Sequence, residues 1–339
     1  MTRSSSVACW SLAAVILLIG SIPAHSEDLK PVTLQLQWRP QAQFAGYMVA
    51  QEKGFYKEAG LPSVELLWYS EGDPPMKRML DGKVDFCTAW LSQAITVRAK
   101  GEKIVNIAQI TQKSALMLVA RRTSGIVKPQ DMTGRRVGLW GADFDVQPLA
   151  FFKKLNIQPK VVPQSYSMTP FLRGAVDVAS AMYYNEYHKL MEAGLSADEI
   201  QPFFFSDFGL NFPEDGLYCT EAERRDRAQT CFAMVSASIK GWAYAAKNEA
   251  ETLDMVMSYC DRAQLATNRN HQRWMLRAMI ELIQHRVGKE SAQWGTLLPG
   301  EYENVANVLR QQGFIQEVPR YDDFYQPAIA AVAGGAKRP

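Results

Sequence analysis

The sequence predicts an α/β protein built from two similar lobes. Strand patterns and helix patterns alternate along most of the chain, which is typical of a parallel sheet covered by helices. The phrase Leu-x-Gly-x-Val-Asp occurs at residues 80–85 and again at 172–177, each time at the start of a strand pattern. A length of 339 residues exceeds that of most single-core domains. Two lobes with the same order of elements account for all three observations.

The elements of the two lobes follow the same sequence of types. In the first lobe, alternating or apolar runs predict strands and apolar residues at helical spacing predict helices, with glycine stops at Gly54 and Gly101. In order, we expect a strand over 32–38, a helix within 42–56, a strand over 64–69, a short helix over 74–83, a strand over 84–90 and a helix over 91–101. The second lobe repeats the first five as a strand over 134–140, a helix over 146–157, a strand over 160–166, a short helix over 168–174 and a strand over 176–184.

After the second lobe the pattern predicts a return to the first. Residues 212–220 read as a strand, and residues 221–313 are mostly helical, with apolar residues at i, i+3 and i+4. We therefore expect a discontinuous first lobe of residues 27–120 and 216–325 and a second lobe of residues 121–215. The crossings are expected near Ala120–Thr123 and Asn211–Asp215, with a flexible tail over 326–339.

The repeated phrase is interpreted as a supporting turn. Gly82 and Gly174 suit a left-handed cap between a short helix and a strand. Asp85 and Asp177 are expected to bond backbone groups and not a ligand.

The N-terminal region predicts export. Arg3 precedes an apolar run of about ten residues, 11–20, which is too short to span a bilayer. Small residues before Glu27 predict cleavage there, so residues 1–26 are expected to be a signal peptide of a periplasmic protein; a retained membrane anchor is the alternative. Cys9 precedes the apolar run, which excludes it as the lipid-bearing cysteine of a lipoprotein.

Four cysteines remain after that cleavage. Cys219 and Cys231 flank a polar segment and could form a disulfide in an oxidising compartment. Cys87 and Cys260 lie in apolar patterns, where a free thiol behaves as a small hydrophobic group.

Composition and motifs give little support to catalysis or to nucleic-acid binding. The net charge of +2 is small, and charges of one sign form no block. His188, His271 and His285 are interpreted as isolated histidines without a cysteine or carboxylate at metal-ligand spacing. The sequence contains no serine-nucleophile elbow and no phosphate-binding glycine loop. We expect no metal, no cofactor and no nucleic-acid partner, and a monomer.

Aromatic residues at strand ends carry the strongest functional signal. Ligands of open α/β sheets bind beyond the carboxyl ends of the strands. The aromatic residues at or just past such ends are Trp38, Trp90, Trp140, Tyr183 and Tyr184. If the two lobes face each other, these rings converge, and they predict a flat, ring-shaped ligand.

Glu186 follows the last of these strands. It could simply be an acidic residue in the first turn of a helix. Alternatively, its two oxygens could accept N–H bonds from a ligand that carries an amino group beside a ring nitrogen. A ligand without the amine would leave the buried carboxylate unpaired, which would make the site selective.

Several segments in this order resemble a known family. They are LQLQWRPQAQFAGYMVAQEKGFYKEAGL, DGKVDF, GEKIVNIAQI, RRVGLWG, MTPFL, VDVASAMYYNE and FSDFGLNFPEDGLY, between about Val32 and Ile315. The chain is similar to periplasmic substrate-binding proteins for thiamine precursors, in a superfamily shared with sulfonate binders and the fungal thiamine pyrimidine synthase.

The resemblance implies a type II periplasmic binding protein of an ABC importer. Its ligand would be an aminopyrimidine thiamine precursor resembling formylaminopyrimidine, delivered to a permease of the inner membrane. Tyr184, Asn185 and Glu186 match the stretch that holds the pyrimidine, and Trp38 matches the stacking aromatic. Gln43, Phe44 and Asp207, within the first and last of the quoted segments, complete the expected ligand contacts.

The departures from the family argue against its other activities. The synthase has a lysine and a histidine where this chain has Ala89 and Gln93, and a cysteine-rich run where FGLNFPEDG has none. A carboxylate at the mouth of the cleft would repel a sulfonate. A carrier for a flavin or a sulfonate, an enzyme acting on a pyrimidine, and a sensor module remain the alternatives.

Overall fold

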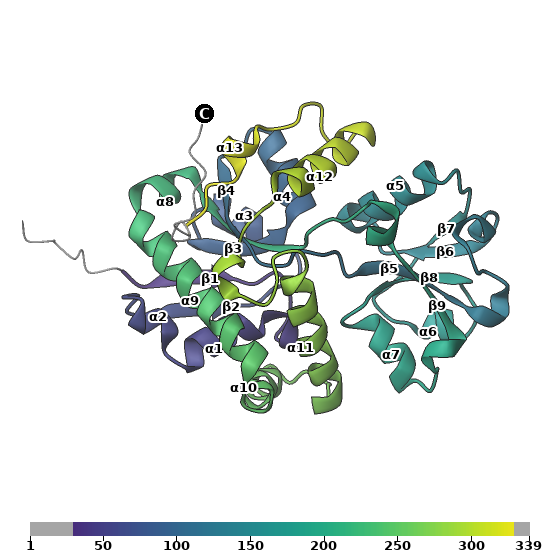
Figure 1. Ribbon diagram of the computed structural model, residues 1–339, viewed down its shortest axis with the longest axis horizontal. Coiled ribbons are helices and arrows are strands. Elements are labelled where there is room, and N and C mark those ends of the chain that lie inside the picture. The colour runs from purple at the N-terminus through teal and green to yellow at the C-terminus, as the bar shows by residue number, and fades with distance from the viewer. Residues whose placement is uncertain (1–29, 329–339) are drawn as a thin grey trace, which may run out of the picture.

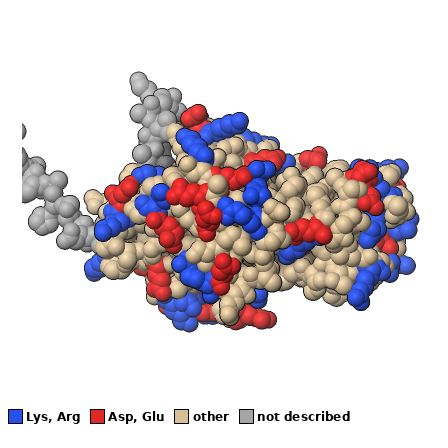
Figure 2. All heavy atoms as spheres, turned by 90° about the horizontal axis from the view of Figure 1, so that it is seen from below, with Lys and Arg blue, Asp and Glu red and all other residues tan. Residues whose placement is uncertain are grey.

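A computed structural model describes residues 30–328 of the chain, and the expected signal peptide lies outside this range. The described residues form two α/β lobes, each around its own five-stranded sheet (Figure 1). The predicted fold class is confirmed. Within residues 30–328, each helix is too short or too polar to cross a lipid bilayer. Acidic and basic side chains are interspersed over the face drawn in Figure 2.

The first sheet consists, from edge to edge, of β2 (Val64–Leu67), β1 (Val32–Gln35), β3 (Phe86–Trp90), β10 (Asp215–Thr220) and β4 (Ile104–Gln109). The strands β1, β2 and β3 run parallel to one another. The strand β10, which brings the chain back from the second lobe, runs antiparallel to β3 and to β4.

The second sheet consists, in the same manner, of β7 (Lys160–Pro163), β6 (Arg136–Leu139), β8 (Val178–Met182), β5 (Leu116–Arg121) and β9 (Ile200–Phe204). Here β5 is the strand that arrives from the other lobe, and it runs antiparallel to β8 and to β9. Each lobe therefore repeats one strand order, with the incoming strand in fourth place.

The first crossing lies earlier in the chain than the sequence predicts. The chain leaves the first sheet after Gln109 and enters the second at Leu116, so residues 116–120, expected in the first lobe, pair with β8 and β9. The cause is the apolar run LMLVA, which forms a strand buried within the second sheet. The chain returns to the first sheet at Asp215.

Helices cover both faces of the first sheet (Figure 1). On one side lie α1 (Ala45–Glu52), α2 (Phe55–Glu58), α9 (Ala228–Lys247), α10 (Glu249–Arg262) and α11 (Arg269–Gln284). On the other side lie α3 (Pro75–Leu80), α4 (Leu91–Ala99), α12 (Pro299–Gln311) and α13 (Tyr321–Phe324), while α8 (Glu221–Asp226) joins β10 to α9. The second sheet carries α5 (Val146–Lys154), α6 (Thr169–Leu172) and α7 (Glu186–Glu192).

The helices α1 and α9 pack at unusually close range. A Cβ atom built on Gly241 of α9 would overlap the carbonyl oxygen of Gly46 on α1. Likewise, a Cβ atom on Gly46 would overlap the indole of Trp242, which is fully buried. The absence of side chains at these two positions allows the helix backbones to meet.

The repeated Gly-x-Val-Asp phrase has the structural role predicted for it. Gly82 and Gly174 have φ angles of 70° and 73°, in the left-handed region that favours glycine. Asp85 accepts bonds from the Thr33 backbone N–H and hydroxyl, each at 2.8 Å. Asp177 accepts a bond from the Arg136 backbone N–H, also at 2.8 Å. The aspartates thus tie β3 to β1 in the first lobe and β8 to β6 in the second.

Two further expectations need correction within the described residues. Cys219 and Cys231, considered for a disulfide, are free buried thiols, one at the end of β10 and one in α9. Gln326 and Ala328, expected to begin a flexible tail, donate backbone bonds to Asn106 and Ile107 of β4, at 3.0 Å each. Residues 329–339 of that expected tail lie outside the described residues.

Candidate ligand-binding cleft

A cleft with a volume of about 940 Å³ lies between the two lobes. Drug-sized ligands occupy pockets of about 300–1,000 Å³. Segments that follow strand ends line the cleft on both sides, as expected for an open α/β sheet. The first lobe contributes residues 38–41, 69–71, 265–268 and 271–272, and the second contributes Tyr166, Asn185, Glu186, Lys189 and Glu192.

Three aromatic rings form the wall of this cleft. Trp38, just past β1, stacks on Tyr69, just past β2, with ring centroids 5.3 Å apart and planes at 22°. Tyr166 of the second lobe meets Trp38 edge-on at 5.1 Å. Because 47% of Tyr166 is exposed although it contacts Trp38, this ring is open to a ligand entering the cleft.

The aromatic contacts continue toward the hinge, the region where the two crossing segments join the lobes. Tyr166 lies 5.6 Å from Trp140 at the end of β6, and Trp140 meets Phe144 at 5.4 Å. Phe144 in turn meets Trp90, at the end of β3 in the first lobe, at 4.8 Å. The structure thus brings Trp38, Trp90 and Trp140 into one cluster that spans the lobes. Among the described residues, the Trp140 Nε1–H is buried without a hydrogen-bond partner.

Glu186 lies at the start of α7, is 3% exposed and lines the cleft. Its Oε2 accepts the Met182 backbone N–H at 3.1 Å, and its Oε1 accepts the Asn185 side-chain amide at 2.6 Å. Burial raises the pKa of the Glu186 carboxyl, and the nearby Lys189 opposes part of that increase. A carboxylate oxygen can accept two bonds. Each oxygen therefore retains capacity for one N–H of a ligand.

Asn185 connects the two lobes beside Glu186. While its amide group donates to Glu186, its Oδ1 lies 3.0 Å from Nε2 of His271, on α11 of the first lobe. A carboxamide oxygen is an acceptor, so His271 carries its proton on Nε2. The carboxylate of Glu186 is thus positioned by a hydrogen-bond chain that requires the lobes to be close.

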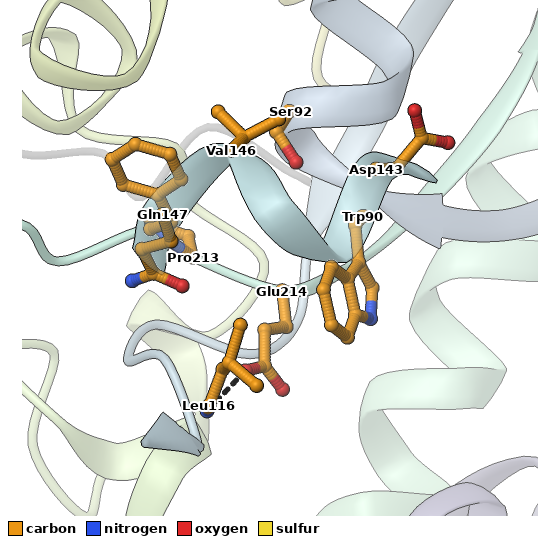
Figure 3. A pocket seen from close by; sticks show the side chains of 9 residues that line it. Trp90, Ser92, Leu116, Asp143, Val146, Gln147, Pro213 and Glu214 are labelled. Atoms are coloured by element: carbon orange, nitrogen blue, oxygen red, sulfur yellow. Dashed lines mark hydrogen bonds between the residues drawn. The ribbon is translucent and has the colours of Figure 1, made fainter. Parts of the chain in front are cut away.

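A second, much smaller cavity lies deeper, at the hinge (Figure 3). Its volume of about 10 Å³ has room for about one water molecule. Trp90 and Glu214 face it from the first lobe and the second crossing, and Leu116 and Gln147 come from β5 and α5. The cavity is too small for an organic ligand and belongs to the hinge.

Glu214 holds the two crossings together. Its Oε1 accepts the backbone N–H groups of Ala115 at 2.6 Å and Leu116 at 3.1 Å, and the Ser114 hydroxyl at 3.2 Å. Burial, with a contribution from the charge of Asp215, raises the pKa of the Glu214 carboxyl to about 8. Burial therefore favours the protonated form of Glu214 in the folded protein.

Asp215 is also buried, and its carboxyl accepts a hydrogen bond from the side chain of Gln43. The Gln43 Nε2 donates to Asp215 Oδ2 at 2.9 Å, and Gln37 donates to Oδ1. Burial raises the pKa of the Asp215 carboxyl to about 7, although these two hydrogen bonds act to lower it. Tyr184 is buried, and the charges of Glu214, Asp215 and Glu186 add to burial in raising its pKa. Gln43 and Tyr184 are thus buried near Asp215 and do not line the cleft.

Six of the predicted contacts line neither cavity, namely Trp140, Gln43 and Tyr184, described above, and Phe44, Tyr183 and Asp207. Phe44 is fully buried in the first lobe because it starts the helical region that packs against the sheet. Tyr183 lies in the turn after β8 and packs against Trp274, with ring centroids 5.4 Å apart. Asp207 is exposed in a 3₁₀ turn before the second crossing.

Other cleft residues escaped the sequence analysis. Tyr69 and Tyr166 end predicted strands, so the rule that selected Trp38 also applies to them. His188 and His271, interpreted as isolated, lie with their Nδ1 atoms 2.9 Å apart. His188 and Glu192 are four residues apart on one helix, a spacing that could have revealed their proximity.

Comparisons with known proteins place this geometry in a family. The chain is 21% identical to the formylaminopyrimidine-binding protein of Halalkalibacterium halodurans, over 84% of this chain and 88% of that protein. It is 23% identical to the riboflavin-binding protein RibY of Chloroflexus aurantiacus, over 80% of this chain and 78% of that protein.

A solved structure shows the same fold. The periplasmic aliphatic sulphonate-binding protein SsuA of Escherichia coli superposes with a TM-score of 0.68 at 11% identity, covering 91% of this chain and 96% of that one. The fold is therefore that of the periplasmic binding proteins. A family model described as "NMT1/THI5 like" matches residues 41–252. Since this match covers more than half of the sequence, the chain belongs to the NMT1/THI5-like family.

Proposed function

We propose that the protein is the solute-binding component of an ABC importer and that it binds an aminopyrimidine thiamine precursor between its lobes. The observation that carries this proposal is the combination in one cleft of the buried Glu186 carboxylate and the rings of Trp38 and Tyr166. The rings suit the faces of a pyrimidine, and the two free acceptor positions of Glu186 suit an amino group beside a ring nitrogen. The name of the Halalkalibacterium relative supports this ligand class.

Closure of the lobes would select the ligand. The cleft residues come from both lobes, so stacking and the Glu186 bonds are complete only when the lobes are together. Shifting a 1:99 open-biased equilibrium to 99:1 requires about 5.5 kcal/mol of preference for the closed state. One buried ring contact and two charge-assisted bonds are of that order.

Calorimetry on wild type and Glu186→Gln tests the ligand assignment. In the variant, an amide N–H group stands where a carboxylate oxygen accepted an N–H group of the ligand. The variant therefore loses at least one charge-assisted bond, worth about 1.5–3 kcal/mol. The Kd for a formylaminopyrimidine should rise about 10- to 100-fold. Glu303→Gln, at an exposed glutamate of α12, is the matched control and should bind as wild type does. Equal affinity in Glu186→Gln and Glu303→Gln would remove Glu186 from the site.

A flavin carrier is the second candidate. A volume of about 940 Å³ is at the upper end of ligand pockets and has room for a planar molecule larger than one pyrimidine. The RibY relative is named for riboflavin. Titration with riboflavin under the same conditions separates the two, because tighter riboflavin binding would favour the flavin.

The remaining parts of the proposal concern place and partners. We place the protein in the periplasm as a monomer that delivers its ligand to an inner-membrane permease, without turnover of the ligand. Mass spectrometry of the protein purified from its host should show an N-terminus at Glu27. Incubation with a candidate pyrimidine should return it unchanged, and a product would instead indicate an enzyme.

A further inference from the structure

Three metal-ligating side chains from both lobes meet at the edge of the cleft. His188 and Glu192 lie on α7 of the second lobe, and His271 lies on α11 of the first. The two Nδ1 atoms are 2.9 Å apart, and Nδ1 of His271 is 3.5 Å from Oε2 of Glu192. One ligand atom from each residue lies within 4.8 Å of the others.

Two of these distances, 2.9 and 3.5 Å, are close to the spacing of neighbouring ligands around zinc. Zn²⁺ binds imidazole nitrogen at about 2.0–2.1 Å and carboxylate oxygen at about 2.0–2.2 Å, so tetrahedral ligands are roughly 3.3 Å from one another. We propose that His188, Glu192 and His271 form a site for Zn²⁺ or a similar divalent transition metal that joins the two lobes. Two imidazoles and one carboxylate are a donor set that proteins use for zinc with a fourth position left open.

The surroundings of His271 favour metal binding. The Asn185 carbonyl oxygen accepts the Nε2–H of His271, which leaves the lone pair of Nδ1 directed at His188 and Glu192. Such an outer partner fixes the tautomer of metal-binding histidines.

The ring of His188 is held in place as well. It stacks on Trp274 of α11, with ring centroids 4.9 Å apart and planes at 23°. A direct hydrogen bond between the two Nδ1 atoms is the competing arrangement, and it would need a proton on Nδ1 of His188. A bound metal ion would replace this single bond with three bonds that link α7 to α11.

The site lies beside the proposed ligand position. Glu192 and His271 line the cleft, so an open fourth position could take water or a ligand atom. Asn185 connects His271 to Glu186. Metal binding would therefore hold together the lobes that the pyrimidine also holds together, and it can be measured without any pyrimidine.

The test uses the full mature chain without a histidine tag, stripped of metal by a chelator. Titration with Zn²⁺ by calorimetry should give one site, and Co²⁺ should give the visible absorption of a low-coordinate complex. His188→Ala and Glu192→Gln should each weaken binding at least about tenfold. His285→Ala, at the remaining histidine of the described residues, is the matched control and should leave binding unchanged.

Three outcomes would overturn the proposal. They are no binding by wild type, unchanged binding in both His188→Ala and Glu192→Gln, and an equal loss in His285→Ala. The side chain of Glu192 is 34% exposed, so Glu192→Gln is expected to fold even if a histidine variant does not. Small-angle scattering tests the joining of the lobes: Zn²⁺ should lower the radius of gyration of wild type but not of Glu192→Gln. A radius that Zn²⁺ leaves unchanged would contradict the link between lobes.

Discussion

Replacement of Glu214 by glutamine should change how the stability of the protein depends on pH. Glu214 is buried at the hinge, where its Oε1 accepts N–H groups from the other crossing. Its Oε2 is buried and has no hydrogen-bond partner among the described residues. A glutamine can retain the Oε1 bonds and puts a neutral group in place of Oε2. The variant therefore mimics the protonated form of Glu214 at every pH.

The expected magnitude follows from the pKa of this carboxyl. Burial raises it from 4.5 to about 8 in the folded protein. Between these values the unfolded chain has lost its proton while the folded protein keeps it, so the free energy of unfolding falls as pH rises. At about 1.36 kcal/mol per pKa unit, the full loss is on the order of 5 kcal/mol, as an upper limit. The variant should lack this loss, although Asp215 will retain a smaller one in the same direction.

The assay is urea unfolding at pH 5, 7 and 8.5, followed by tryptophan fluorescence and by circular dichroism. Coincidence of the two signals checks that the lobes unfold together. At pH 5 the variant should be as stable as wild type or less stable by about 1–3 kcal/mol, because its new N–H group has no partner. At pH 8.5 it should be the more stable of the two. Glu303→Gln should follow wild type. Parallel curves for wild type and Glu214→Gln would refute the assignment of a raised pKa to Glu214.

Two further predictions concern packing and the aromatic wall. Gly241→Ala should lower the free energy of unfolding by about 1–3 kcal/mol, because its Cβ would overlap the Gly46 carbonyl. Gly300→Ala, in a helix with open space around the residue, should instead raise the stability slightly. Thermal melts in which the two variants change the melting temperature alike would contradict the close contact at Gly241. Trp38→Ala should raise the Kd for the pyrimidine about tenfold through loss of a ring contact and apolar area. Calorimetry that finds the same Kd would place the ligand away from Trp38.

Local patterns predicted most of the fold. The repeated phrase correctly indicated two equivalent lobes, because its glycine conformation and its aspartate bonds are determined within a few residues and one neighbouring strand. The first crossing was placed too late because Leu116–Arg121 is an apolar run with no turn residue to mark where one sheet ends and the next begins. Only the pairing of β5 with β8 and β9 decides the sheet to which it belongs.

The site was predicted in part, for a related reason. Position after a strand end was sufficient to predict that Trp38, Trp90 and Trp140 converge, since parallel strands end at a common edge, although of the three only Trp38 lines the cleft. It did not distinguish Tyr183, which packs against Trp274, from Tyr184, which is buried near Glu214 and Asp215. The contact between His188 and His271 joins positions 83 residues apart on different lobes. Such a contact depends on how the lobes meet, which no local pattern contains.

The position of β10 has a consequence for the order in which the protein folds. This strand lies between β3 and β4 in the first sheet, yet it follows the whole second lobe in the chain. The second sheet is complete once residue 204 is available, whereas the first still lacks the strand that connects β4 to the rest. The first sheet can therefore be completed only with residues that follow the second lobe in the chain. Because contacts distant in sequence form slowly, we expect the second lobe to fold before the first sheet is complete.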